Sequence, residues 1–117
     1  MADGKGSNAA KEKTTIAETI FEKKDDTLNV RPAGRLDTAT SPVFEKELRQ
    51  HLDGVQHIVM DFTDVEYVSS AGLRTLLTAE RLMEDRDGGV RLTHVNANIL
   101  EVFEMVGFME IVTVERD

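Results

Sequence analysis

The sequence contains no cysteine and no tryptophan, and its 117 residues include one tyrosine and two prolines. The absence of cysteine excludes disulfides, thiolate-bound zinc and thiol catalysis. No apolar run approaches the roughly 20 residues that a membrane-spanning helix needs, and the N-terminus lacks the apolar core of a secretory signal. We therefore expect a cytoplasmic protein whose core consists of Val, Ile, Leu, Met and the five Phe.

Cations are also scarce. Fourteen Lys and Arg stand against 22 Asp and Glu, which gives a formal net charge of −8. Such a surface repels the phosphates of nucleic acids and of anionic lipids, so we expect neither nucleic acid nor a membrane as a partner. It would suit a protein partner with a basic docking face.

The length is that of one domain. Residues 1–13 are small, polar and charged, and they cannot bury enough apolar surface to offset the entropy of ordering. We expect them to form a disordered N-terminal tail, and residues 14–117 to form the folded domain.

Hydrophobic periodicity predicts strands that alternate with helices. A strand at 58–62 has an almost continuous apolar run, which favours a central position covered on both faces. The first helix is expected to begin at Ser41 as N-cap and to end at Gly54. A second helix follows Ser70 with Glu80 facing outward, and a third, capped by Asn96 or Asn98, has Val102 and Val106 facing inward before Gly107. The remaining strands are expected at residues 14–23, 28–36, 90–95 and 111–114, with Pro32 marking an edge or a bulge.

This order predicts an α/β fold in which helices pack on a mixed, largely parallel sheet. In such folds, functional groups gather where a central strand ends and the next helix begins.

Two serines, Ser69 and Ser70, occupy that place here. The backbone N–H groups at a helix N-terminus are unpaired and carry partial positive charge, so they could accept a phosphate on Ser70. The phosphate's charge of roughly −1.5 to −2 would then act on whatever docks there, and Gly72 would leave the surface low for its approach. The alternative is that the serines only cap the helix, which is their commonest role at this position.

Three segments resemble the STAS-domain anti-sigma-factor antagonists. Residues 65–74 (VEYVSSAGLR) are similar to the phosphorylation-site signature of that family, residues 34–37 (GRLD) to its Gly-x-Leu-Asp element, and residues 98–108 (NILEVFEMVGF) to its closing helix. The segments fall in family order, and the resemblance covers about residues 15–115. It implies a STAS fold, with a mixed sheet of four to five strands flanked by about three to four helices.

The resemblance also implies a partner switch. The antagonist binds an anti-sigma factor that is also a serine kinase of histidine-kinase-like ATPase fold, and a metal-dependent serine phosphatase reverses the phosphorylation that ejects it. It implies Ser70 as the acceptor, and partner contacts at Asp37, Ser69, Ser70, Ala71, Gly72 and Arg74. Asp37 could equally be a turn residue. Many family members carry Asp where this chain has Ser69, which could be the acceptor but is better explained as the N-cap.

We expect no catalytic activity of the chain itself. It has no P-loop, paired-carboxylate motif or nucleophile elbow, and its three His are too scattered for a metal site or a catalytic base. No cofactor is expected, and the absence of heptads favours a monomer. Two other functions stay open: a STAS subunit of an ABC-type lipid or solute transport complex, and a small-ligand sensor.

Overall fold

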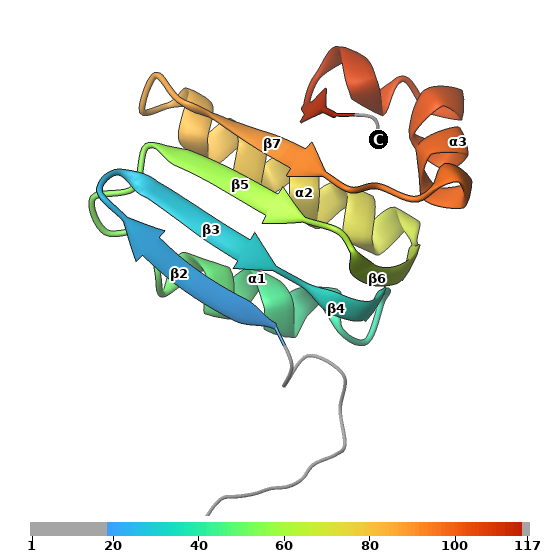
Figure 1. Cartoon of the computed structure of the whole chain (residues 1–117), viewed down its shortest axis with the longest axis horizontal. Coiled ribbons are helices and arrows are strands. Elements are labelled where there is room, and N and C mark those ends of the chain that lie inside the picture. Colours follow the sequence, from blue (N-terminus) through green and yellow to red (C-terminus); the bar gives the residue numbers. More distant parts are fainter. Residues whose placement is uncertain (1–18, 116–117) are drawn as a thin grey trace, which may run out of the picture.

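The computed structural model describes residues 19–115, which form one mixed sheet, a smaller second sheet and three α-helices (Figure 1). The strands β2 (Ile20–Lys24) and β3 (Thr27–Arg31) form an antiparallel hairpin around a turn at Asp25 and Asp26. The other strands of this sheet are parallel, in the order β2-β3-β5-β7-β8: β5 is His57–Asp61, β7 is Gly89–Thr93 and β8 is Thr113–Val114. The predicted mixed sheet is confirmed. The predicted tail, and residues 14–18 of the first predicted strand, lie outside the described residues.

The second sheet has two parallel strands, β4 (Ala33–Leu36) and β6 (Asp64–Val68). The sequence predicted one strand through residues 28–36, but Pro32 divides it. Proline has no N–H to donate, so the ladder of β3 ends there and the chain moves across to pair with β6. The register of β4 shifts between Gly34 and Arg35, two residues beyond the bulge that Pro32 suggested.

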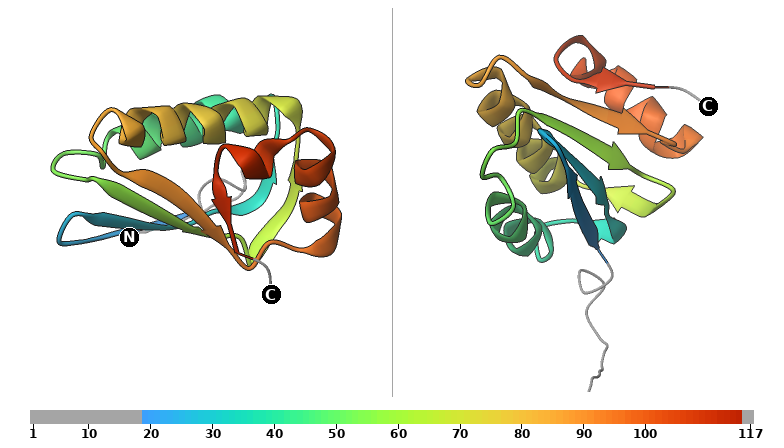
Figure 2. Two further views of the ribbon diagram at one scale, coloured as in Figure 1. Left: turned by 90° about the horizontal axis from the view of Figure 1, so that it is seen from above. Right: turned by 60° about the vertical axis from the view of Figure 1, so that its left-hand side comes forward.

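The helices α1 (Ser41–Arg49) and α2 (Ser70–Glu84) cover the same face of the main sheet (Figure 2). Helix α1 differs from the prediction at both ends, since its N-cap is Thr40 and its C-cap is Gln50. Gly54, with φ of +75°, belongs to the turn that follows.

Helix α3 (Ala97–Met105) lies beyond the end of β7, and a 3₁₀ turn, η3 (Phe108–Glu110), leads from it back to β8 (Figure 1). Asn96 is the N-cap of α3, and its side chain accepts a hydrogen bond from the Ile99 N–H at 2.9 Å. Gly107 follows with φ of +73°, as predicted for a helix that ends in a left-handed residue. Phe108 then packs its ring 4.4 Å from that of Phe103.

The prediction that both faces of β5 are covered was wrong, because α1 and α2 lie on only one face of the sheet. Ile58 and Met60 point to the helices and are buried, whereas Val59 and Asp61 face the other way and are half-buried. Three other predicted orientations were also wrong. Val102 on α3 and its C-cap Val106 are exposed. Glu80 is buried, and its Oε1 accepts a hydrogen bond from the Val90 N–H at 2.8 Å.

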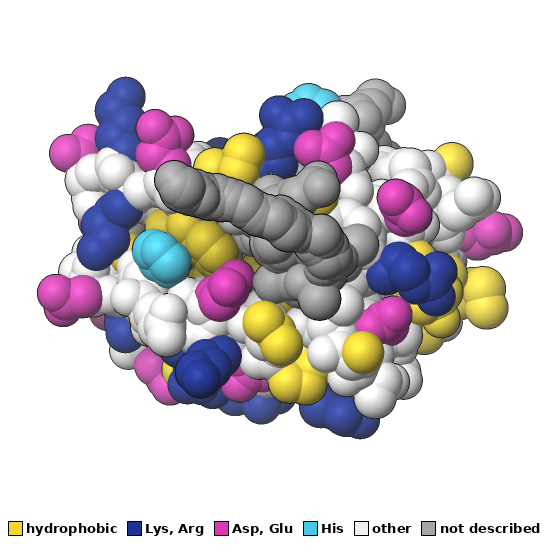
Figure 3. Space-filling model, turned by 90° about the horizontal axis from the view of Figure 1, so that it is seen from below, with side chains coloured by type: hydrophobic (Ala, Val, Ile, Leu, Met, Phe, Trp, Pro, Cys, Tyr) yellow, Lys and Arg dark blue, Asp and Glu magenta, His cyan; other side chains and the backbone are white. Residues whose placement is uncertain are grey.

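No helix between residues 19 and 115 is long and apolar enough to cross a membrane. On the face seen from below, basic and acidic side chains are interspersed (Figure 3).

Candidate functional site

The two adjacent serines at the start of α2 have different surroundings. Ser69 has extended backbone, and its Oγ accepts a hydrogen bond from the Gly72 N–H at 3.3 Å. Ser69 is therefore the N-cap, as predicted. Ser70 is the first helical residue and its side chain is exposed. The capping task thus falls to one serine and leaves the hydroxyl of the other accessible.

Gly72 fixes how closely α2 approaches the second sheet. A Cβ at this position would lie 2.5 Å from the Leu36 carbonyl oxygen and 2.9 Å from Val68 Cγ1. Gly72 is buried, so the glycine is needed for packing between α2 and β4 rather than for access from outside. The Ser69 N–H also donates to the Leu36 carbonyl oxygen at 2.9 Å, which ties the serine segment to β4.

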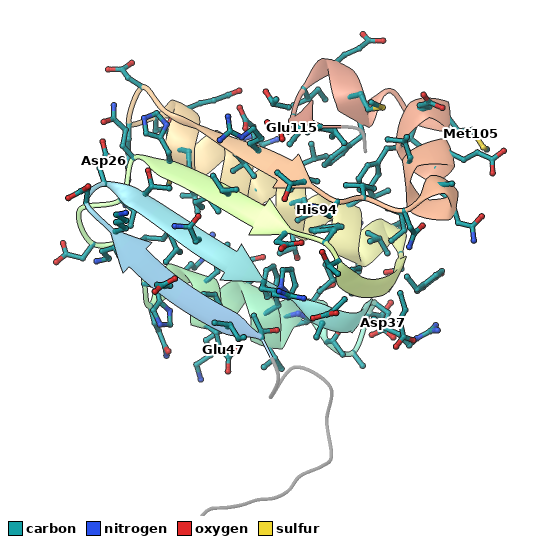
Figure 4. The ribbon with its side chains drawn as sticks, viewed as in Figure 1. Asp26, Asp37, Glu47, His94, Met105 and Glu115 are labelled. Atoms are coloured by element: carbon teal, nitrogen blue, oxygen red, sulfur yellow. The ribbon has the colours of Figure 1, made fainter. Side chains whose placement is uncertain are left out.

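Asp37 lies directly after β4 (Figure 4), and Ser69 lies directly after β6. These strands are parallel neighbours with Leu36 opposite Val68, so Asp37 and the two serines come to the same end of the second sheet. The pairing of β4 with β6 is therefore what places Asp37 at the same end of the sheet as Ser70, although the two are far apart in the sequence.

Asp37 also organises the turn before α1. Its Oδ1 accepts hydrogen bonds from the N–H groups of Ala39 and Thr40, both at 3.0 Å, and its carbonyl oxygen accepts one from the Ser41 N–H. The Thr40 N–H, with smaller contributions from Arg35 and Ala39, holds the pKa of Asp37 below its usual value. The carboxylate is therefore charged at neutral pH and fixed in the turn, so Asp37 has the structural role of a turn residue.

Two residues that sequence analysis missed complete this surface. Arg35 lies opposite Tyr67 in the ladder, and its guanidinium lies 4.4 Å from the centre of the Tyr67 ring. Arg35 Nε also lies 3.4 Å from Asp37 Oδ2. Arg35 and Tyr67 are both exposed, so an aromatic ring and a cation accompany Asp37 at this end of the sheet. The signal lies in the register of β4 against β6, which spacing along the chain does not reveal.

The chemistry available to these residues is that of an acceptor and a docking surface. Among the described residues, no group of three His, Asp or Glu could hold a metal ion. A phosphoryl group on Ser70 would lie at the positive end of the α2 dipole, beside backbone N–H groups of the first turn. Arg74, one turn further along α2, is exposed on the same helix. The arrangement can thus accommodate phosphorylation without disturbing the core.

The family model described as the STAS domain matches residues 18–117. The chain belongs to the STAS family. The STAS fold and the resemblance to anti-sigma-factor antagonists, both expected from the sequence, are confirmed.

The sequence relatives of this STAS domain are described as anti-sigma factor antagonists. A protein of Bordetella bronchiseptica assigned as an anti-sigma factor antagonist, BtrV, is 32% identical over 92 residues, which cover 78% of this chain and 79% of the relative. The anti-sigma-B factor antagonist of Listeria monocytogenes is 26% identical over 103 residues, covering 86% of this chain and 90% of the relative.

Solved structures show the same fold. A Thermotoga maritima protein assigned as an anti-sigma factor antagonist superposes with a TM-score of 0.78 at 19% identity, covering 85% of this chain and 86% of that one. The anti-sigma factor antagonist SpoIIAA in its unphosphorylated form gives 0.67 at 18% identity, with 85% and 88% covered.

Proposed function

We propose that this STAS domain is an anti-sigma-factor antagonist that binds an anti-sigma factor in the cytoplasm, and that phosphorylation of Ser70 ends the binding. The observation that carries the proposal is the division of labour at the start of α2. Ser69 accepts the capping hydrogen bond, and the Ser70 hydroxyl is exposed. The relatives described above carry the name of anti-sigma factor antagonist, so the transport-subunit alternative has no support from them.

Asp37, Arg35 and Tyr67 belong to the docking surface in this proposal, together with Ser69, Ser70, Ala71 and Arg74. Arg35, Tyr67, Ser70 and Arg74 are exposed, and Asp37, Ser69 and Ala71 are half-buried. Asp37 and the serines lie at one end of the second sheet, and Arg74 lies one turn along α2, which supports this assignment. The chain supplies no catalysis of its own. A serine kinase of histidine-kinase-like ATPase fold, which is the anti-sigma factor itself, would phosphorylate Ser70, and a metal-dependent serine phosphatase would restore it.

The switch acts through charge. A phosphate adds about −1.5 to −2 charge at neutral pH, and at the centre of a contact it brings repulsion from neighbouring carboxylates and a cost of desolvation. Asp37 is already ionised at the same end of the sheet. A phosphate on Ser70 would therefore add to the negative charge that this surface carries before modification.

The first experiment is phosphopeptide mapping of the protein from its own cells, with and without stress. Trypsin should release residues 50–74 as one peptide that contains both serines, and we expect phosphate on Ser70. Phosphate on Ser69 would correct the residue, and an unmodified peptide under every condition would contradict the switch.

The second experiment measures affinity for the cognate anti-sigma factor. We expect Ser70→Ala to bind as the wild type does and Ser70→Glu to bind at least tenfold more weakly, a loss of about 1.4 kcal/mol or more. Thr113→Glu is a matched control, because it adds the same charge at an exposed residue of β8. Equal binding by Ser70→Glu and the wild type would contradict the proposal.

A further inference from the structure

A groove runs between α1 and α2, the two helices that lie side by side over the main sheet (Figure 2). It encloses about 440 Å³ and begins beside Ser70, since the next residue, Ala71, forms part of its wall. Its lining includes Ser41, Pro42, Lys46 and Arg49 from α1, and Ala71 and Arg74 from α2.

The charge of this groove is opposite to that of the whole chain. Three cations, Lys46, Arg49 and Arg74, line it together with one anion, Glu45, whereas the chain as a whole has a net charge of −8. Arg49 is paired with Glu45 at 3.1 Å. Within residues 19–115, neither Lys46 nor Arg74 has a carboxylate partner. Two cations therefore remain available in a protein that is otherwise anionic.

The groove also contains an unsatisfied polar group and apolar surface. Ser41 is 2% exposed, and its hydroxyl makes no hydrogen bond within the described part of the chain. A buried hydroxyl without a partner costs about 1–3 kcal/mol, but its oxygen has almost no accessible surface, so recognition in the groove rests on its charges and apolar contacts. Pro42, Ala71 and the aliphatic stems of the basic side chains supply apolar contact.

We propose that this groove binds an acidic segment of a partner protein, with Lys46 and Arg74 receiving its carboxylates and Pro42 and Ala71 its apolar side chains. The positive charge of the groove favours an acidic occupant. A second copy of this chain is a less suitable occupant, because the acidic surfaces of the two copies would repel each other outside the groove. Side chains of two neighbouring helices line the groove, which gives a polypeptide segment contacts on both sides.

The assignment of that segment to the anti-sigma factor rests on the proposed function, whereas binding of an acidic segment does not. A partner docked at Ser70 would reach the groove directly, because Ala71 and Arg74 are one residue and one helical turn away. The groove would then add affinity and orientation to a contact whose switch is Ser70.

The test uses the full chain labelled with ¹⁵N and a synthetic 12-residue peptide in which pairs of Glu and Leu alternate. We expect amide shifts in α1 and the first two turns of α2, and affinity that falls with added salt. Lys46→Glu/Arg74→Glu should weaken binding at least tenfold. A matched pair of charge reversals outside the groove, Lys24→Glu/Arg81→Glu, should weaken it less than threefold.

Several results would overturn the proposal: equal weakening by the two double variants, equal binding of a peptide with Lys in place of Glu, or shifts elsewhere on the protein. Tighter binding of ATP than of the peptide at these residues would also overturn it in favour of a nucleotide site. If Lys46→Glu/Arg74→Glu is unfolded by circular dichroism, Lys46→Gln/Arg74→Gln gives the same test. Phosphopeptide mapping of Ser70 is a separate readout, so the groove can fail while the proposed switch stands.

Discussion

At the scale of single residues, the main feature is that two identical side chains in succession have different tasks. Ser69 contributes a hydrogen bond to the fold, and Ser70 contributes an exposed hydroxyl. The two tasks can be separated by stability measurements that need no partner.

We expect Ser69→Ala to lower the free energy of unfolding by about 1 kcal/mol, because the Gly72 N–H loses its side-chain acceptor. Ser70→Ala should change it by less than about 0.5 kcal/mol, since the removed hydroxyl is exposed. Urea unfolding followed by circular dichroism measures both, and each variant serves as the control of the other. A larger loss for Ser70→Ala than for Ser69→Ala would reverse the assignment of the cap.

The residues around this pair also show where sequence reasoning succeeds and where it ends. Ser69 as a cap and Gly107 as a helix end follow from local backbone chemistry, and both were predicted. Arg35 and Tyr67 meet only because β4 pairs with β6 in one register, and a single sequence does not contain that register.

At the scale of elements, the contact between α2 and β7 depends on a buried carboxylate. Glu80 is 8% exposed and accepts the Val90 N–H at the start of β7. Burial raises the pKa of Glu80, and the neighbouring Glu84 raises it further, while the Val90 N–H acts in the opposite direction. The sequence placed Glu80 on the outer face of the helix, because charged side chains are rarely buried unless they have a partner.

This raised pKa gives a prediction with a definite sign. The folded state holds the Glu80 proton more tightly than the unfolded state, so the group stabilises the fold below its unfolded pKa. That contribution is lost as the pH rises through the folded pKa. Glu80→Gln keeps an oxygen for the Val90 N–H without the charge. We expect it to be more stable than the wild type at pH 7.5, by roughly 0.5–2 kcal/mol, and to lose this advantage in acid.

Thermal or urea unfolding at several pH values between 4 and 8 measures the difference. Glu101→Gln is the matched control, because Glu101 is an exposed residue of α3. A Glu80→Gln variant that is less stable than the wild type at pH 7.5 would show that the ionised carboxylate stabilises the contact.

The strands show a second limit of sequence reasoning at this scale. The apolar run at 58–62 predicted a strand enclosed on both faces, but the outer face of the sheet is open and polar. Two exposed ion pairs lie along that face and its ends, Arg31–Asp64 at 3.0 Å and Arg91–Glu115 at 3.2 Å, and His94 Nδ1 lies 3.2 Å from Asp61 Oδ1. Each joins residues from different segments, so the pairing could be seen only after the strands were in order.

At the scale of the whole molecule, the C-terminal segment completes the core. Phe108 is 2% exposed, its ring is stacked 4.4 Å from Phe103, and Phe103 in turn lies 6.5 Å from Phe62. The aromatic contacts thus connect η3 and α3 to the residue that follows β5. One hydrophobic core joins these segments to the sheet and to α2, so we expect the described part of the chain to unfold as a single unit.

Phe108→Ala tests this unity. Removal of a buried Phe typically costs 3–5 kcal/mol, a large fraction of the 5–15 kcal/mol that stabilises a domain. We expect the urea midpoint to fall sharply while the two available probes still give one coincident transition. Circular dichroism reports the helices, and the fluorescence of Tyr67, the sole tyrosine in a chain without tryptophan, reports β6. Met105→Ala is the control, because Met105 is 79% exposed and points away from the molecule (Figure 4). If Phe108→Ala lost helix signal while the Tyr67 transition stayed in place, α3 and η3 would be a separate unit that the rest of the fold does not require.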